Sequence, residues 1–176
     1  MEPSQNTETT SQVQSQNGTS GYNPEFMKIA AEEALKGMRC GDGGPFGAVI
    51  VKDGKIIAQG HNMVIKTHDP TAHAEVTVIR KACAALERFD ISDCEIYSSC
   101  EPCPMCFAAI HWAKMTKLYY GCTRKDAADI GFDDNFIYDV INGKAEKLQV
   151  ELEQRDRDIC MTAFEAWTHK DDRVQY

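Results

Sequence analysis

Apolar and polar residues alternate along most of this chain with the spacing of helices or of strands. Between residues 24 and 37, apolar side chains recur every three to four positions, which predicts an amphipathic helix. Residues 46–51 form a continuous apolar block that predicts a buried strand, and Asp53-Gly54 predicts a tight hairpin turn. Residues 55–59 are therefore expected to return antiparallel to the first strand.

The rest of the chain continues with segments of both kinds. Helical spacing is found at 72–86, 107–113, 136–141 and 159–167, and short strand-like segments at 94–98, 118–121 and 148–152. Strands that alternate with helices predict a layered α/β sandwich with a mixed sheet. The hairpin supplies the antiparallel pairing, and each strand–helix–strand unit supplies a parallel pair.

The first 21 residues fit neither pattern. They are rich in Gln, Ser, Thr and Asn and contain no Lys, Arg or aromatic residue. Such a segment cannot bury enough apolar surface to offset the entropy of ordering, so we expect residues 1–21 to form a disordered polar tail. A mitochondrial targeting peptide is disfavoured because the segment contains Glu2 and Glu8 and no Arg. Residues 22–176 are expected to form one domain.

Composition narrows the class of protein. The 176 residues are enough for one domain with a sizeable core, and no stretch approaches the roughly 20 consecutive apolar residues of a membrane span. The net charge is −8, and no basic run is longer than the Arg80-Lys81 and Arg124-Lys125 pairs. This balance favours a small-molecule substrate over a nucleic acid. The eight cysteines fit reduced thiols better than a disulfide scaffold, which predicts a cytoplasmic protein.

Two short motifs carry the candidate chemistry, His73-Ala74-Glu75 and, about thirty residues later, Cys103-Pro104-Met105-Cys106. One imidazole and two thiols suit Zn²⁺, which prefers nitrogen and sulfur ligands in a tetrahedron. With His73, Cys103 and Cys106 as ligands, a fourth position is left for water, as in catalytic zinc sites. Glu75 stays outside the ligand set. This combination is the signature of zinc-dependent deaminases, in which the Glu transfers protons.

Other interpretations of the cysteines are weaker. A closed structural zinc site would add Cys100, but it would leave Glu75 without a role. Pro102 and Pro104 also restrict the backbone between the thiols. An iron–sulfur cluster is disfavoured because Cys106 is not followed by the fourth cysteine and the proline of the ferredoxin run. Outside the enzyme class, the alternative is a zinc-stabilised interaction module, and the free acid Glu75 argues against it.

Four longer segments make the sequence recognisable. They are Gly-Gly-Pro-Phe-Gly-Ala-Val at 43–49, Asp-Pro-Thr-Ala-His-Ala-Glu-Val at 69–76, Ser-Cys-Glu-Pro-Cys-Pro-Met-Cys at 99–106 and Gly-Phe-Asp-Asp at 131–134. With them the chain resembles the guanine deaminases of the cytidine-deaminase-like superfamily, and it is similar to plant guanosine deaminases. The likeness covers about residues 24 to 176. The Gly-Phe-Asp-Asp segment narrows the match to the guanine group.

The resemblance implies a three-layer α/β/α sandwich with a five-stranded mixed sheet. It also implies a tight homodimer whose C-terminal segment is exchanged between subunits, and conversion of guanine to xanthine with release of ammonia. Zinc would be the cofactor, held by His73, Cys103 and Cys106, with Glu75 as the proton shuttle. Asp134 matches an acid near the departing amino group and is expected to act as a second shuttle.

Three further residues match substrate-binding positions of the family. Asn62 matches an asparagine that holds the purine, Phe46 an aromatic that packs on the ring, and Tyr176 a C-terminal aromatic at the pocket. Each also has a simpler explanation, as a loop residue that bonds its own backbone, a core residue and a frayed terminus, respectively. Trp112, near the cysteine-containing helix, is expected either to line the pocket or to pack in the core. Asp133 is expected to cap the helix that follows it.

The substrate stays open among related deamination reactions. Guanosine, cytosine and tRNA adenosine are the alternatives to guanine. A tRNA enzyme should carry a basic groove, whereas this chain is acidic. Guanosine would require room for a ribose, which the sequence does not reveal. The sequence thus predicts a zinc-dependent hydrolase with a small purine substrate and no membrane or nucleic-acid partner.

Overall fold

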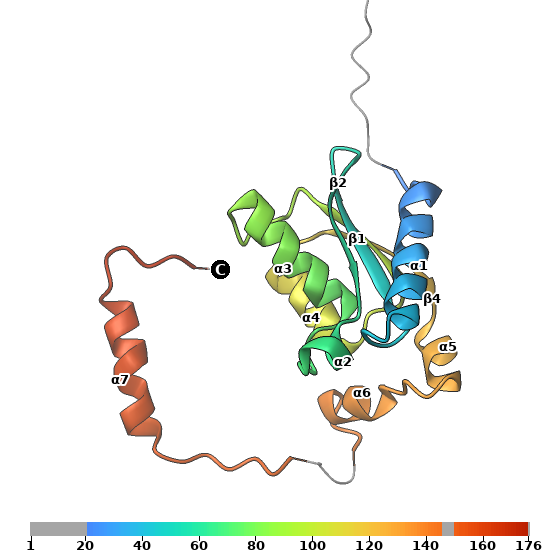
Figure 1. The fold of residues 1–176 in the computed structure, drawn as a ribbon. Helices are drawn as coiled ribbons and strands as arrows, with labels where there is room; N and C mark the ends of the chain where they lie inside the picture. Colours follow the sequence, from blue (N-terminus) through green and yellow to red (C-terminus); the bar gives the residue numbers. More distant parts are fainter. Residues whose placement is uncertain (1–20, 146–149, 176) are drawn as a thin grey trace, which may run out of the picture.

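The computed structural model describes residues 21–145 and 150–175. In this part of the chain, four strands form one sheet with the order β2-β1-β3-β4 (Figure 1). The strands are β1 (Gly47–Lys52), β2 (Lys55–His61), β3 (Glu95–Cys100) and β4 (Lys117–Cys122). The helices are α1 (Pro24–Arg39), α2 (Val64–Thr67), α3 (Ala74–Leu86), α4 (Pro104–Trp112), α5 (Arg124–Asp129), α6 (Asn135–Ile141) and α7 (Arg157–Thr168).

The pairing of the strands confirms the predicted hairpin and the mixed sheet. β1 is antiparallel to β2 on one side and to β3 on the other, whereas β3 and β4 are parallel. Asp53 and Gly54 have φ values of 49° and 72°, which a tight two-residue hairpin turn requires. Because β3 and β4 are parallel, the loops that follow them start at the same edge of the sheet. That edge holds the candidate site.

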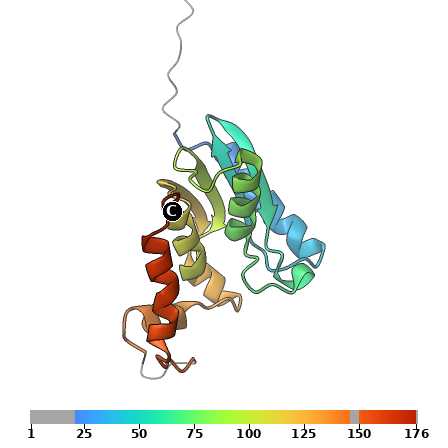
Figure 2. The same cartoon turned by 90° about the vertical axis from the view of Figure 1, so that its left-hand side faces the viewer.

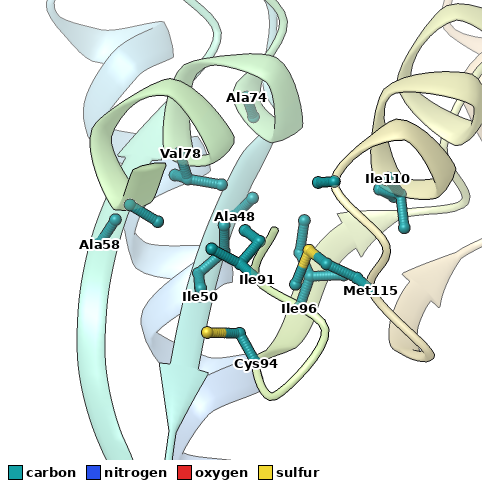
Figure 3. Close-up of a cluster of buried hydrophobic side chains, with 12 residues drawn as sticks. Ala48, Ile50, Ala58, Ala74, Val78, Ile91, Cys94, Ile96, Ile110 and Met115 are labelled. Carbon is teal, nitrogen blue, oxygen red and sulfur yellow. The ribbon is translucent and has the colours of Figure 1, made fainter. Parts of the chain in front are cut away.

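The central strand β1 is covered on both faces, so its side chains enter two separate cores. Ala48 and Ile50 belong to a cluster formed with α3 and α4, shown in Figure 3. Val49 and Val51 pack on the opposite face against α1. A continuous apolar run is the pattern of a strand buried on both faces, which explains the sequence of β1. The predicted α/β sandwich of three layers is confirmed.

The expected count of five strands is wrong for the described residues, which contain four. The fifth strand was placed at 148–152, and the first two of these residues lie outside the described ranges. Residues 150–152 adopt no strand, and Val150 and Leu152 are 68% and 82% exposed. Alternating apolar residues form a strand only where a neighbouring strand edge accepts their backbone hydrogen bonds, and none pairs with this segment.

Helix α7 stands apart from the sheet and its covering helices in Figure 1, and Figure 2, viewed from that side, places it in front of them. Its apolar side chains are open to solvent, with Ile159 71% and Phe164 68% exposed. None of the described helices has the length and apolar character that a membrane span requires.

Candidate active site

Two helix starts face each other at the edge of the sheet. His73 is the N-cap residue of α3 and Cys103 is the N-cap residue of α4, both with extended backbone angles. Neither side chain caps its own helix, so the imidazole and the thiol are turned to one another instead. Pro104 fixes the first turn of α4, because proline is favoured at the first helical position. Cys106, in the same turn, is fully buried.

The three predicted metal ligands form one cluster. The ligand atoms of His73, Cys103 and Cys106 lie within 4.8 Å of one another. The His73 Nδ1 atom is 3.5 Å from Cys103 Sγ and 3.6 Å from Cys106 Sγ. Zinc bonds of about 2.3 Å to sulfur and 2.0–2.1 Å to nitrogen at a tetrahedral angle place these atoms about 3.6 Å apart. The donor set and its spacing therefore fit Zn²⁺.

The electrostatics of the cluster favour a thiolate. The hydrogen bond from the Cys106 thiol, followed by that from His73, lowers the pKa of the Cys103 thiol well below its ordinary value, against the effect of burial. Metal ligation requires the thiolate form of cysteine. Cys100, the candidate for a fourth ligand, is not in the cluster. Its thiol donates to the Thr123 carbonyl oxygen, and burial raises its pKa to about 12. A closed four-ligand site is therefore not formed.

Glu75 lies beside the cluster without joining it. Its side chain is 6% exposed, and Oε1 accepts a hydrogen bond from the Ser98 hydroxyl at 3.0 Å. Burial raises the pKa of this carboxyl, more than the hydrogen bonds lower it. A carboxyl with a raised pKa can both take and give a proton near neutral pH, as a general acid–base group must. Ser98 was not predicted as a site residue. The one indication in the sequence was a hydroxyl group in an otherwise buried strand.

A cavity of about 710 Å³ opens onto the cluster. Its lining includes most of the predicted site residues, namely Phe46, Asn62, His73, Glu75, Cys103 and Asp134. It also includes Arg124, which sequence reasoning missed because it lies far from both motifs along the chain. The guanidinium of Arg124 stacks 4.8 Å over the ring of Tyr138. Cavities of ~300–1,000 Å³ are typical of small-molecule sites.

Asn62 has the contacts of a loop residue and also a position at the cavity, as the two interpretations of its sequence position require. The Asn62 side-chain oxygen accepts a hydrogen bond from the Val64 backbone amide at 3.1 Å, which is the local backbone bond of a loop residue. The same side chain is 5% exposed and lines the cavity. Within the described part of the chain, its amide nitrogen makes no hydrogen bond and remains a donor for a ligand. Phe46 likewise packs at the edge of the core and lines the cavity, 5.0 Å from the ring of Phe132.

The two acids of the Gly-Phe-Asp-Asp segment differ in their contacts. Asp133 Oδ1 accepts from the Asn135 backbone amide at 2.9 Å, a local bond of the turn before α6, and Asp133 also lines the cavity. The N-cap residue of α6 is Asp134, so the prediction that Asp133 caps this helix is wrong. Asp134 caps nothing with its side chain and lines the cavity, and burial followed by the charge of Cys103 raises its pKa. Tyr176 lies outside the described residues.

The structure does not bring Trp112 to the cavity, and it does not bury it either, since this residue is 63% exposed. Trp112 is the last residue of α4, whose first turn holds Cys106. A helix of nine residues is about 13 Å long, so its end lies far from the metal ligands at its start.

Comparison with known proteins defines the class. The family described as the cytidine and deoxycytidylate deaminase zinc-binding region matches residues 22–122, and the chain belongs to this family of zinc-dependent enzymes. The chain is 48% identical over 151 residues to the guanine deaminase of Bacillus subtilis (strain 168), covering 86% of this chain and 97% of that protein. The crystal structure of that guanine deaminase superposes with a TM-score of 0.84 at 47% identity, over 89% of this chain and 99% of the other.

Two further relatives have a lower sequence identity to this chain and match a smaller part of it. A structure of the guanine deaminase from Nitrosomonas europaea gives a TM-score of 0.60 at 34% identity, covering 64% of this chain and 65% of that one. The tRNA-specific adenosine deaminase of Agrobacterium fabrum (strain C58 / ATCC 33970) is 46% identical over 97 residues, which cover 54% of this chain and 62% of that protein. The resemblance to guanine deaminases seen in the sequence is thereby confirmed.

Proposed function

We propose that this protein catalyses the zinc-dependent hydrolytic deamination of guanine to xanthine and ammonia. The observation that carries the proposal is the unliganded carboxyl of Glu75, buried beside a three-residue zinc cluster at a cavity of purine-binding size. Similarity to a guanine deaminase over nearly the whole of both chains supports guanine as the base.

Each site residue receives a role from its position. Bound zinc supplies Lewis-acid activation of the attacking water. Glu75 takes one proton from that water and delivers it to the ring nitrogen. It then takes the remaining proton of the hydroxyl added to the ring carbon and delivers it to the amino group, which leaves as ammonia, so the water oxygen replaces the amino nitrogen on the ring carbon. Ser98 holds the Glu75 carboxyl in place through its hydroxyl.

The remaining assigned residues contact the purine. The free amide nitrogen of Asn62 donates to an acceptor on the base, and Phe46 packs on the ring. Asp134, with its raised pKa, is the second proton carrier at the amino group. We also assign Tyr176 to this pocket, by resemblance to the family.

Guanosine is the second candidate substrate. The volume of the cavity, about 710 Å³, lies in the upper part of the range of ~300–1,000 Å³ that is typical of small-molecule sites, and such a volume suits a nucleoside as well as a free base. Deamination of tRNA adenosine is less well supported, because the tRNA-specific relative matches only about half of this chain and the net charge is −8.

We further propose that the catalytic domain spans residues 22–176, with residues 1–21 as a polar tail outside it, and that it works as a homodimer that exchanges its C-terminal segment. Helix α7 stands apart from its own sheet (Figure 1), and its apolar residues, including Ile159 and Phe164, are exposed. A partner subunit that packs on α7 would remove these side chains from water. A cytoplasmic location is proposed because all eight cysteines are free, as expected in a reducing compartment.

The test is a substrate panel. Purified protein is incubated with guanine, guanosine, cytosine, cytidine and adenine, and ammonia release is measured. We expect release from guanine, with any activity on guanosine showing how far the cavity admits a ribose. Activity on adenine or the cytosine compounds alone would overturn the proposal.

A further inference from the structure

A buried bridge of hydrogen-bonding side chains lies next to the cavity and takes no part in the proposed chemistry. It joins Glu33 of α1, Asp42 of the following loop and His61 at the end of β2. His61 Nδ1 is 2.8 Å from Glu33 Oε2, and Nε2 is 2.9 Å from Asp42 Oδ2. The three residues are only 6–8% exposed. The sequence does not indicate a role for His61, because neither acid lies near it along the chain.

Both ring nitrogens of His61 face a carboxylate. An ionised carboxylate only accepts hydrogen bonds, so in each contact the ring nitrogen is the donor when it carries its proton. Burial pushes the pKa of Glu33 upward, but hydrogen bonds from His61, Lys36 and Gln59 together hold it below its ordinary value. The hydrogen bond from His61 also lowers the pKa of Asp42. Each carboxylate therefore stays ionised and keeps its partner.

Helix α1 is shaped to receive this ring. A Cβ atom at Gly37 would lie 2.4 Å from His61 Cδ2, closer than real atoms approach. The missing side chain lets the imidazole lie against the helix backbone between its two acids. This explains a glycine in the last third of α1, where it otherwise weakens the helix by ~1 kcal/mol relative to alanine.

Both ends of the bridge lead directly into the purine site. Asn62 follows His61 along the chain, and Gly43 follows Asp42. A Cβ atom at Gly43 would lie 2.1 Å from Asn62 Oδ1, so the glycine loop is packed against the Asn62 side chain. The Asp42 carbonyl accepts from the backbone amides of Ile65 and Lys66 at 3.1 and 3.0 Å, which ties the loop to α2 on the other side of Asn62.

We propose that the Glu33–His61–Asp42 bridge is a positioning device for substrate recognition, which locks the Gly43 loop and the Asn62 amide in the orientation that binds the purine. The inference rests on the proposed role of Asn62 in binding the base. None of the three bridge residues lines the cavity, so they act through Asn62 and the loop and not on the reacting atoms.

The test is a KM-against-kcat comparison on the zinc-loaded full chain with guanine. His61→Leu and Asp42→Ala should each raise KM by about tenfold or more, which corresponds to about 1.4 kcal/mol per factor of ten. In both variants, kcat should stay within a few-fold of the wild-type value, and the zinc content should be unchanged. Because both substitutions break the same bridge, the double variant should be little worse than either single variant. If His61→Leu fails to fold, His61→Gln, which keeps one donor, and Asp42→Asn give the same comparison.

Glu95→Gln is the matched control. Glu95 is also a buried carboxylate, 8% exposed, paired with Lys117 at 3.2 Å, but it lies in β3 away from the cavity lining. It should lower thermal stability and leave KM unchanged. Bridge variants that lose stability like the control but keep the KM of the wild type would overturn the inference, and so would fully additive effects in the double variant.

Asn62→Ala separates the proposed role of Asn62 from the proposed role of the bridge. Unchanged kinetics in that variant would refute the role of Asn62 itself. A raised KM in Asn62→Ala together with a normal KM in the bridge variants would refute only the role of the bridge.

Discussion

At the scale of single residues, function depends on which polar groups are left without a local partner. His73 and Cys103 begin helices but do not cap them, and so their donor atoms point to a shared centre. The Asp133 side chain accepts from the Asn135 amide, whereas Asp134, the N-cap residue of α6, makes no side-chain bond that caps the helix. The Cys100 thiol donates a hydrogen bond to the Thr123 carbonyl oxygen, whereas the thiols of Cys103 and Cys106 face the His73 imidazole. Neighbouring residues of the same type thus have different contacts.

Glu75→Gln separates a proton carrier from a metal ligand. The amide has nearly the same shape but cannot accept a proton, and proton transfer alone contributes ~10²–10⁴ in rate. We expect guanine turnover to fall by at least that factor while about one zinc per chain remains bound. Loss of zinc from this variant would show that Glu75 is a ligand.

Substitution of Cys106 and of Cys100 is expected to affect zinc binding differently. Cys106→Ala removes one of three ligands and should leave the protein nearly free of zinc in metal analysis after dialysis, with loss of activity. Cys100→Ala is the control, because its thiol bonds the Thr123 carbonyl and should not be needed for the metal. Equal zinc loss in both variants would mean that Cys100 also ligates the metal.

At the scale of the elements, the site depends on how closely α1 and β1 approach. A Cβ atom at Gly47, the first residue of β1, would lie 2.1 Å from the Ala30 carbonyl oxygen and 2.5 Å from the Ala34 amide nitrogen. These are backbone atoms of α1, which cannot rotate away as a side chain could. The close contact holds the start of β1 and, just before it, Phe46 at the rim of the cavity.

Gly47→Ala should therefore destabilise the fold. Overpacking a tight contact typically costs ~1–3 kcal/mol, and the upper end is expected where the clash is with backbone. The measurement is the free energy of unfolding from denaturant titration. Gly21→Ala serves as the control, since a Cβ there meets nothing within 4 Å. Equal unfolding free energies for both variants would contradict the close contact.

At the scale of the whole molecule, the sheet with its covering helices is one body, and α7 is separate from it (Figure 1). Exposed apolar side chains on α7 and on the outer surface of α4, where Phe107 is 50% and Trp112 63% exposed, are the groups that a dimer would cover. A second subunit therefore gives a physical reason for the exposure of both.

Exchange of the C-terminal segment predicts complementation between two inactive proteins. A Glu75→Gln chain and a Tyr176→Ala chain are each expected to turn over guanine poorly. In a mixed dimer with exchanged ends, one of the two sites combines an intact Glu75 with an intact Tyr176 from the other chain, and the other site has both defects. Mixing should thus restore part of the activity, measured by ammonia release. A mixture shown to contain mixed dimers but without restored activity would mean that Tyr176 serves its own subunit or none.

The amino-acid sequence by itself determined the features that depend on local chemistry. The hydrophobic spacing predicted β1, the hairpin and the longer helices, because burial on one or two faces produces a regular spacing of apolar residues in the sequence. It did not predict the short helix α2 (Val64–Thr67). The zinc cluster and Glu75 were predicted from two short motifs, because donor types and helix starts are local properties.

Only the tertiary structure decided the features that join distant segments. The Ser98 hydroxyl reaches Glu75 across 23 positions, and His61 meets Glu33 across 28, and neither partner is marked in the local sequence. The distance of Trp112 from the cavity follows from the direction of α4, and the absence of a strand at 150–152 follows from the lack of a neighbouring edge. These outcomes depend on packing between elements, which hydrophobic period and residue type leave undetermined.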